Sequence, residues 1–550
     1  MQAYLQYRRI GQAVQKQLDD YPELAHLPEH HQVPDLPEQP SQTPDTQEKP
    51  EFSTIPPGIQ PHHYTDASGK QSTIYLVTWA DDHDTLNPQN YTHASRLAAT
   101  LNVTALAFIV GAASSIESGV LPQNAAAFGV SDVVASLATG IYLLGFAAGS
   151  LVSGPLSEVL GRNAVYAGSL TLFMIWEMAS GLAPNIGAQL AFRFLAGIFG
   201  CPPLTCAGGT VADLWNPLEK TLLFPMYAIL SFGGPILGPV IASWMGQGVL
   251  SWRWTSWIIL IASGLVMATV ILFQPETYSP LLLKWKAHQL RLRTGDNRFH
   301  AEMELEKTAL FTRMTGACFR QFELTMHEPI ILLISLYMTI IYIVLFTFFD
   351  GYEYIYTDVH DLSQGLTNIV WVAMYCGIML VALLVPLVYR WTKREFEAAE
   401  AEAEPGVDGK KKVHTRPENR LWFAMMGAPF IPIGLFWMGW TDYSNISIWS
   451  PILASTIFGF GTITVFISSY MYIIDSYDIY AASALGFMTV SRYAAAGGMT
   501  VVGVPFYKNM GVQYTLTILG CISAVMTVVP YVFYRWGHVI RGWSRYAVNK

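Results

Sequence analysis

Charged residues are scarce in this 550-residue chain: Asp, Glu, Lys and Arg make up only 13% of it, whereas 52% of the residues are hydrophobic. A soluble protein has roughly twice that charged fraction, about 25%. Cysteine is rare as well, and five residues without a Cys-x-x-Cys pair exclude a disulfide framework and give no metal-binding pattern. There is no basic excess, since the net charge is −8, so nothing indicates a nucleic-acid partner. The composition that remains is that of a membrane protein.

The negative charge belongs to the N-terminal segment. Residues 1–94 hold 13 acidic and five basic residues, and the rest of the chain holds 27 of each. This segment is rich in Pro, Gln, Asp, Glu and His and lacks an apolar run typical of a signal peptide. We therefore expect residues 1–94 to be a disordered cytosolic tail, with either a short surface helix or a frayed segment at 5–18. The run DDHD at 81–84 lacks a second ligand group, which favours a solvated cluster over a metal site.

After this tail come twelve apolar segments of about 20 residues, the length that crosses a hydrocarbon core of roughly 30 Å. They lie near residues 96–116, 133–153, 164–183, 188–208, 222–244, 254–273, 329–349, 367–389, 421–440, 447–470, 482–506 and 513–534. The longest connection divides them six and six, the pattern of a transporter with two pseudo-symmetric halves. The expected fold is an all-α membrane protein whose parts are a six-helix bundle, a cytosolic linker, a second six-helix bundle and a cytosolic C-terminal tail, at 95–273, 274–328, 329–536 and 537–550.

Lysine and arginine predict the orientation of the chain. They gather in the connections on one side of the expected membrane, whereas the other side carries only Arg253 and Lys508. Because positively charged loops stay in the cytosol, both termini are expected to be cytosolic. Within the linker, LLLKWKAHQLRLR has apolar and basic faces at helical spacing. This favours an amphipathic helix on the inner leaflet, although a tether that only carries positive charge explains the same pattern.

The turn between spans 2 and 3 reads GPLSEVLGRNAVYAG, from residue 154 to 168. Gly154 and Gly161 allow helix ends to approach closely, while Glu158 and Arg162 lie on one face if the turn is helical. These two residues can pair with each other or with a neighbouring helix end. Asp213, at the cytosolic end of span 4, is a candidate to join them, or it caps a helix. We expect these five residues to form a cytosolic gate.

Span 5 contains SFGGPILGPVIASW. Pro235 and Pro239 each remove a backbone donor, and Gly234 and Gly238 allow close helix contact. This combination favours a kinked, tightly packed helix that acts as a hinge.

Ionisable residues within apolar spans are candidates for proton coupling and transport. An arginine near the bilayer centre costs about 3 kcal/mol, so Arg193 should face a cavity or a carboxylate unless it reaches the interface. Arg492, well within span 11, should need an acidic or carbonyl partner. Glu117 and Glu177 lie in the outer third of their spans, where they carry protons or reach the interface. Asp350 ends span 7 among aromatic residues, a composition able to bind flat or cationic solutes.

Five aromatic residues within the spans are candidates for a substrate cavity, although packing or lipid contact is an alternative for each. The candidates are Tyr142, Phe232, Trp371, Tyr375 and Phe466.

These motifs resemble those of a known family. The 154–162 pattern resembles the signature loop of the major facilitator superfamily, with Val159 and Asn163 where basic residues are common. Span 5 resembles the Gly-Pro-x-x-Gly signature of its antiporter branch, with Pro239 in place of the second glycine. Arg193 matches the span 4 arginine of the superfamily. Blocks such as RFLAGIFGCPPLTCAGGTVADLW, QPETY and YIIDSYDIYAASAL are similar to fungal twelve-span drug:proton antiporters, from about residue 76 to the end.

The resemblance implies the major facilitator fold, a gate that closes the cytosolic side, and a role of Arg193 in proton coupling. It also implies export of small amphipathic organic solutes, such as drugs or toxins, across the plasma membrane by a monomer. Export would be driven by the proton gradient, with neither a cofactor nor a metal ion.

Three alternatives remain open. A dedicated exporter of one metabolite or organic acid shares every feature, and Arg193 and Arg492 would then contact the substrate. An uptake symporter shares the bundle but has less support from span 5. A membrane enzyme would need clustered catalytic residues, and the nearest segment, TDVHDL at 357–362, lacks a partner motif.

Overall fold

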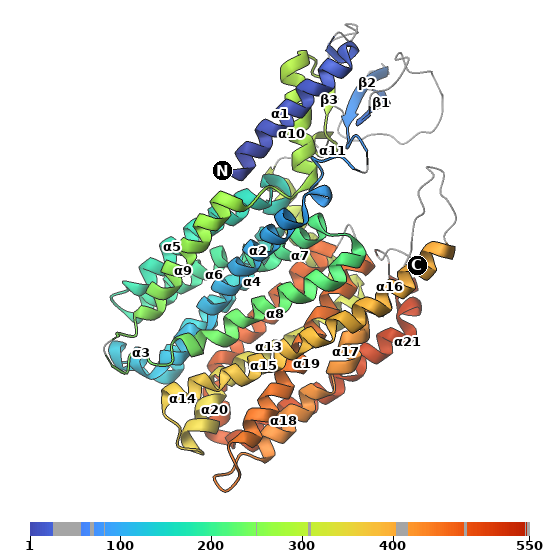
Figure 1. Cartoon of the computed structure of the whole chain (residues 1–550). Coiled ribbons are helices and arrows are strands. Elements are labelled where there is room, and N and C mark those ends of the chain that lie inside the picture. Colours follow the sequence, from blue (N-terminus) through green and yellow to red (C-terminus); the bar gives the residue numbers. More distant parts are fainter. Residues whose placement is uncertain are drawn as a thin grey trace.

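The computed structural model describes residues 1–25, 57–65, 71–81, 83–248, 250–305, 310–402, 416–477, 481–544 and 546. Long helices lie side by side in an elongated bundle, and helix α1, helix α10 and a small sheet stand at one of its ends (Figure 1). The N-terminus and the C-terminal end of the bundle lie toward that same end (Figure 1). We call it the N-domain end, and the other the opposite end.

The first half of the bundle is formed by α2 (His93–Ser115), α4 (Asp132–Leu160), α5 (Arg162–Gly181), α6 (Ile186–Gly200), α7 (Pro202–Leu214), α8 (Pro217–Ile241) and α9 (Trp254–Phe273). The second half is formed by α13 (Pro329–Tyr352), α15 (Trp371–Leu380), α16 (Val385–Glu402), α17 (Trp422–Gly427), α18 (Phe430–Trp440), α19 (Trp449–Tyr477), α20 (Ala481–Met526) and α21 (Val528–Trp543). Short segments cover the opposite end: η3 (Ile116–Val120), α3 (Leu121–Phe128), η4 (Glu353–Asp358) and α14 (Gln364–Ile369).

The number of membrane spans agrees with the sequence. Within the described ranges, ten helical stretches are long and apolar enough to cross a membrane. The 20-residue α5 lies among them and adds one more. The stretch that contains α20 is divided by Gly511, whose φ of 77° and ψ of 167° end one helix and start the next. The result is twelve spans, six in each half, which confirms the predicted fold class.

The predicted hinge segment lies in a close helix contact of the first half, between α8 and α2. A Cβ added to Gly234 would lie 2.2 Å from the carbonyl oxygen of Phe108, and one added to Gly238 would lie 2.2 Å from Ser115 Oγ. Pro235 and Pro239 face glycines of the facing segment, where a Cβ on Gly111 would lie 2.7 Å from Pro235. Tight packing is therefore what these residues provide, and hinge motion remains a prediction.

The N-terminal segment differs from the disordered tail that we expected. Helix α1 (Gln2–Asp20) packs on α10 (Ser279–Thr294), and strands β1 (Ile59–Thr65), β2 (Gln71–Val77) and β3 (Phe299–His300) form a sheet. Strand β2 is antiparallel to β1 and parallel to β3. The linker continues through α11 (Glu302–Leu305) and α12 (Leu310–His327). Disorder is therefore wrong for the described part of residues 1–94, while 26–56, 66–70 and 82 lie outside it.

A second hydrophobic core explains this difference. Ile10 and Val14, one turn apart on α1, are buried against Leu282 and Leu290 of α10 and Phe299 of β3. Each segment alone has too few apolar residues to fold, but together they exclude water from a shared interior. The linker helix that we expected on the inner leaflet therefore exists, but the buried face of α10 packs on this small domain instead of lipid.

Candidate functional site

A central cavity lies between the two halves. All space between the lining atoms, including space open to solvent, measures about 530 Å³, but in this closed state the enclosed part is large enough only for water-sized molecules. Aromatic rings from both halves form most of its wall, and ring centroids are 4.6 Å apart for Phe232 and Phe466, 5.1 Å for Phe146 and Tyr493, and 5.4 Å for Tyr342 and Tyr493. A wall of this kind suits an amphipathic solute with a flat ring system.

Of the aromatic residues proposed from the sequence, Phe232 and Phe466 line this cavity. The other three are placed elsewhere. Tyr142 lies beneath Arg193 and donates a hydrogen bond to the carbonyl oxygen of Val110 at 3.0 Å. Trp371 stacks on Phe349 and Tyr352 in the interior of the second half, and the ring of Tyr375 packs beside Gly233. In this structure, these three side chains pack between helices.

Arg193 is the centre of a buried charge cluster in the first half. Its Nη1 lies 3.5 Å from Glu177 Oε2, and neither side chain is exposed. Nη2 donates to the carbonyl oxygen of Ala113 at 2.6 Å, and the guanidinium carbon lies 4.5 Å from the centre of the Tyr142 ring. The predicted carboxylate partner of Arg193 is therefore Glu177, supplied by α5.

Glu117 belongs to the same buried region. Its carboxylate accepts hydrogen bonds from Asn124 Nδ2 at 3.1 Å and Thr255 Oγ1 at 3.2 Å, and Asn124 also contacts Gln189. Glu117 is close enough to act electrostatically on Glu177. Among the described residues Arg193 therefore pairs with Glu177 alone, and Glu117 adds a second buried carboxyl group near that pair.

Arg492 departs from the expected acidic or carbonyl partner. No carboxylate lies within ion-pair distance of it among the residues that the structure describes. Its guanidinium carbon instead lies 4.7 Å from the ring centre of Tyr342, 4.9 Å from Tyr493, 5.3 Å from Tyr470 and 5.5 Å from Phe466. The expectation was wrong because the faces of aromatic rings, which carry partial negative charge, surround this cation.

Asp350, at the end of α13, is also buried away from any cation in the described part of the chain. Its Oδ2 has no hydrogen-bond partner and lies where a Cβ on Gly503 would come within 2.3 Å. Asp350 does not line the central cavity. It remains a candidate proton carrier, separate from the Arg193 cluster.

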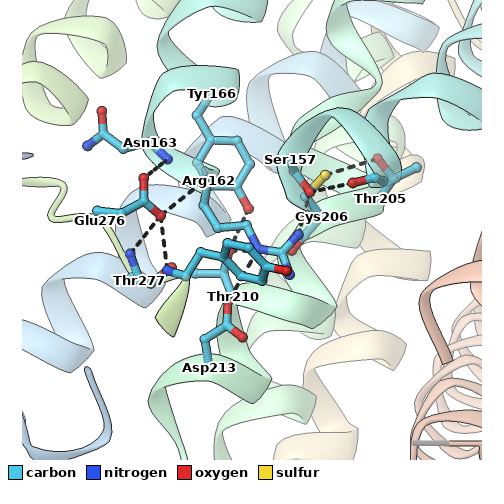
Figure 2. A network of polar contacts seen from close by, with 12 residues as sticks. Ser157, Arg162, Asn163, Tyr166, Thr205, Cys206, Thr210, Asp213, Glu276 and Thr277 are labelled. Atoms are coloured by element: carbon cyan, nitrogen blue, oxygen red, sulfur yellow. Dashed lines mark hydrogen bonds and ion pairs between the residues drawn. The ribbon is translucent and has the colours of Figure 1, made fainter. Parts of the chain in front are cut away.

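Figure 2 shows the contacts that hold the N-domain end of the first half. Arg162 Nε lies 3.3 Å from Asp213 Oδ2, and its Nη1 donates to the Ser157 hydroxyl. Glu158 does not form the ion pair, although the sequence allowed it. Gly161 has a φ of 90°, and a Cβ there would lie 2.5 Å from Leu281. Gly154 has no such neighbour within 4 Å, so only the second glycine of the motif is sterically required.

Glu276 is a member of this cluster that the sequence analysis did not single out. Its carboxylate accepts backbone N–H groups of Arg162 at 2.9 Å and Asn163 at 3.1 Å, and thereby caps the start of α5 (Figure 2). The Gln6 side chain of α1 binds both backbone groups of Glu276, at 2.9 and 3.0 Å. The signal was present, since Glu276 is the acid of QPETY directly after span 6.

A second arginine at the N-domain end connects the two halves. Arg420 pairs with Asp475 at 2.5 Å within the second half, as Arg162 pairs with Asp213 in the first. Arg420 also donates to the Thr221 hydroxyl and, at 3.1 Å, to the carbonyl oxygen of Pro217 at the start of α8. These bonds join the two halves on the N-domain side of the cavity.

Polar contacts also join the halves at the opposite end. Gln364 of α14 donates to the carbonyl oxygen of Gly119 at 2.8 Å and accepts from Gln123 at 2.7 Å and Gln247 at 2.8 Å. Asn368 donates to the same Gly119 oxygen at 3.0 Å. The cavity therefore lies between two sets of contacts across the halves, which is the arrangement of an occluded state.

Twelve apolar helices in two halves, with a cavity between them, define a polytopic membrane transporter. The chain belongs to the Major Facilitator Superfamily, whose family model matches residues 103–500.

Similar proteins include the MFS-type transporter kojT of Aspergillus flavus, 48% identical over 85% of this chain and 82% of that protein. The citrinin biosynthesis cluster MFS transporter mrr1 of Monascus ruber is 32% identical over 87% of this chain and 94% of its own length. The ascochitine biosynthesis cluster MFS transporter of Didymella fabae is 31% identical over 86% and 89%. Among solved structures, the proton:xylose symporter XylE of E. coli has a TM-score of 0.58 at 15% identity, covering 81% of this chain and 97% of XylE, which shows the shared fold.

Proposed function

We propose that this protein exports small amphipathic organic solutes from the cytosol across the plasma membrane in exchange for protons. Solutes in this class are secondary metabolites, toxins and drugs. The names of two similar proteins support this class, because they place those transporters in biosynthesis clusters for secondary metabolites. In this proposal the protein acts as a monomer, needs no cofactor, and has its N-domain end and both termini in the cytosol.

The observation that carries the proposal is the central cavity between two separable sets of contacts. Breaking the Arg420 bonds to α8 would open the cavity to the N-domain end, whereas breaking the Gln364 bonds would open it to the opposite end. Each set consists of a few hydrogen bonds between the halves. Alternating access follows if the halves rock so that one set breaks while the other holds.

The Arg193 cluster supports proton coupling. Glu177 pairs with the buried Arg193 and lies close to the buried Glu117, so uptake and release of one proton by Glu177 changes the charge of a region beside the cavity. Such a change biases helix packing in one of the two open states. A proton that enters against an outward-moving solute contributes about 2.3 kcal/mol per 100 mV of membrane potential.

A dedicated exporter of one organic acid is the second candidate. The observation that favours it is Arg492, a buried cation without a carboxylate partner in the described residues, on the wall of the cavity. An uptake symporter has no comparable support.

The test is efflux from yeast that lacks its own major pumps, preloaded with dyes, azoles, aromatic toxins and aromatic acids. We expect protonophore-sensitive export of at least one class by the wild type. Glu177→Gln should abolish the protonophore-sensitive part, whereas Glu353→Gln, at an exposed carboxylate, should not. Surface expression without export of any compound, or export unaffected by the protonophore, would exclude the proposed function.

A further inference from the structure

We propose that Arg492 is the anion-binding residue of the central cavity, and that the transported solute is a small conjugated acid with a carboxylate or enolate oxygen. The inference deepens the proposed function, on which it rests, by naming the substrate class of the same site. It starts from one residue on α20 whose surroundings differ from those of every other buried arginine in the described ranges.

The first step is the cost of the charge. Arg492 is fully buried, with 1% of its surface exposed, and it lines the cavity. Its Nε and Nη1 have no hydrogen-bond partner within the described residues. A buried guanidinium with unused donors loses hydration without full compensation. The aromatic rings offer the cation their faces, and the Tyr470 hydroxyl also interacts with the guanidinium, but these groups are neutral and compensate only in part.

The second step is the contrast with Arg193 and Arg420. Arg193 has Glu177 and the carbonyl oxygen of Ala113, and Arg420 has Asp475 and the carbonyl oxygen of Pro217. Both are neutralised by the protein itself. Arg492 is the buried arginine whose neutralising anion the described part of the protein does not supply, and it lines the space between the halves that alternating access would open to a solute.

The third step is the shape of the site. Tyr342, Tyr470 and Tyr493 surround the guanidinium at 4.7 to 5.3 Å, and Phe232 and Phe466 continue the wall toward the first half. A flat ring can stack within this wall while its anionic oxygen reaches Arg492. The tyrosine hydroxyls offer further donors to oxygen substituents. A cationic solute would meet repulsion from Arg492, so the site selects against cationic drugs.

The fourth step concerns energy coupling. Outward movement of an anion and inward movement of a proton both carry positive charge inward, in the direction favoured by an inside-negative membrane potential. Proton binding in the Arg193 cluster and anion binding at Arg492 take place in different halves. In a carrier with this arrangement, the proton and the anion do not compete for the same residue.

The test uses purified full-length protein and three matched sets of probes: benzoate, 4-hydroxycinnamate and 1-naphthoate; their neutral amides; and benzyltrimethylammonium. Binding is measured calorimetrically, and transport is measured in proteoliposomes with an imposed pH gradient. We expect at least one anion to bind the wild type at least tenfold more tightly than its amide and the ammonium ion. Arg492→Gln should remove this tenfold preference, and Arg492→Lys should retain part of it.

Three outcomes of the binding measurements overturn the inference: amides or the ammonium ion bind as tightly as the anions, none of the three anions binds at millimolar concentration, or Arg492→Gln keeps the anion preference. The comparison of probes on the wild type does not depend on whether the variants fold. Failure of the proposed function is distinguishable, because it would appear as Arg492-dependent anion binding without pH-driven transport. Export of neutral or cationic solutes that survives in Arg492→Gln would instead uphold export and overturn the inference.

Discussion

Arg193 and Glu177 lie 3.5 Å apart, and neither side chain has any exposed surface. A charge-assisted hydrogen bond is shorter, about 2.8 Å, so this buried ion pair is held loosely. The same arginine is fixed from its other side by the carbonyl oxygen of Ala113 and the ring of Tyr142. In the proposed mechanism, Arg193 therefore stays in place and Glu177 is the partner that takes up and releases the proton.

Glu177→Gln should uncouple transport from protons. Glutamine keeps the size of the side chain but cannot release a proton, so we expect efflux driven by a pH gradient to fall at least tenfold while substrate binding persists. Both are measured on the same proteoliposome preparation. Glu353→Gln, at an exposed carboxylate at the end of span 7, is the control and should transport normally. Full pH-driven efflux in Glu177→Gln would contradict the role of this pair.

The contacts at the two ends of the cavity predict opposite effects on access. Thr221→Val removes a cross-half bond at the N-domain end, and Gln364→Ala removes the Gln364 bonds at the opposite end while the Asn368 bond remains. A loss of 1–2 kcal/mol from one closed state shifts the populations about 5- to 30-fold. We expect a Ser231→Cys reporter in the cavity wall to react faster with impermeant maleimide from the N-domain side in Thr221→Val, and from the other side in Gln364→Ala.

Two results would contradict this assignment. One is faster labelling from the same side in both variants, which would indicate general loosening of the bundle. The other is unchanged labelling in both, which would mean that these hydrogen bonds do not hold the cavity closed. A Thr269→Val variant, whose hydroxyl bonds only within its own helix, serves as the matched control and should leave both rates unchanged.

The sequence predicts the bundle well because hydropathy is a local property. Each span needs only about 20 consecutive apolar residues, and the packing of glycines 234 and 238 is visible in their spacing. The gate is only partly predictable. Arg162 is found from its own loop, but Glu276 binds its backbone across 114 positions, and Arg420 reaches Thr221 across 199. Contacts between residues so far apart in the chain leave no periodic pattern in the sequence from which they could be predicted.

The role of Arg420 could have been inferred from the internal symmetry between the two halves of the chain. It stands at the start of span 9 and Asp475 at the end of span 10, as Arg162 and Asp213 stand at the start of span 3 and the end of span 4. The N-terminal domain had no such signal, because its core needs Phe299 from a two-residue strand in the distant linker. The aromatic surroundings of Arg492, which has no carboxylate partner among the described residues, were also hidden, since ring geometry around a cation is not encoded by spacing along one helix.

Gly161→Ala should destabilise the protein, whereas Gly154→Ala should not. Alanine at 161 would keep a φ of 90° and place its Cβ 2.6 Å from Glu276 Oε2, displacing the carboxylate that caps α5. We expect a cost of about 1–3 kcal/mol in the free energy of unfolding. Gly154 lies within α4 and has open space around its Cβ position, so alanine there should be neutral or slightly stabilising. Thermal unfolding in detergent measures both, and equal Tm changes would contradict the steric argument.

Asp442 lies in the connection between α18 and α19, at the opposite end of the bundle. Its burial predicts that the stability of the protein depends on pH. Burial raises the pKa of its carboxyl group to about 7. Burial also lowers the pKa of His360, whose Nε2 lies 3.7 Å from Asp442 Oδ1. Because the pKa of Asp442 is higher in the folded protein than the usual value near 4, folding favours its protonated form. Its contribution to stability is full below pH 4 and is lost as the pH rises through 7.

Asp442→Asn should remove this dependence, since asparagine resembles the protonated carboxyl group at every pH. We expect the Tm of the variant to exceed that of the wild type increasingly between pH 5 and pH 8, with the difference smallest at pH 5. The exposed Asp361→Asn is the matched control in the same loop cluster and should follow the wild type.

His360 has the opposite effect on stability below its own pKa, because the buried neutral imidazole must take up a proton there. His360→Asn is therefore measured in parallel. A Tm difference between Asp442→Asn and the wild type that stays constant over this range would show that Asp442 is ionised throughout, held by the His360 imidazolium.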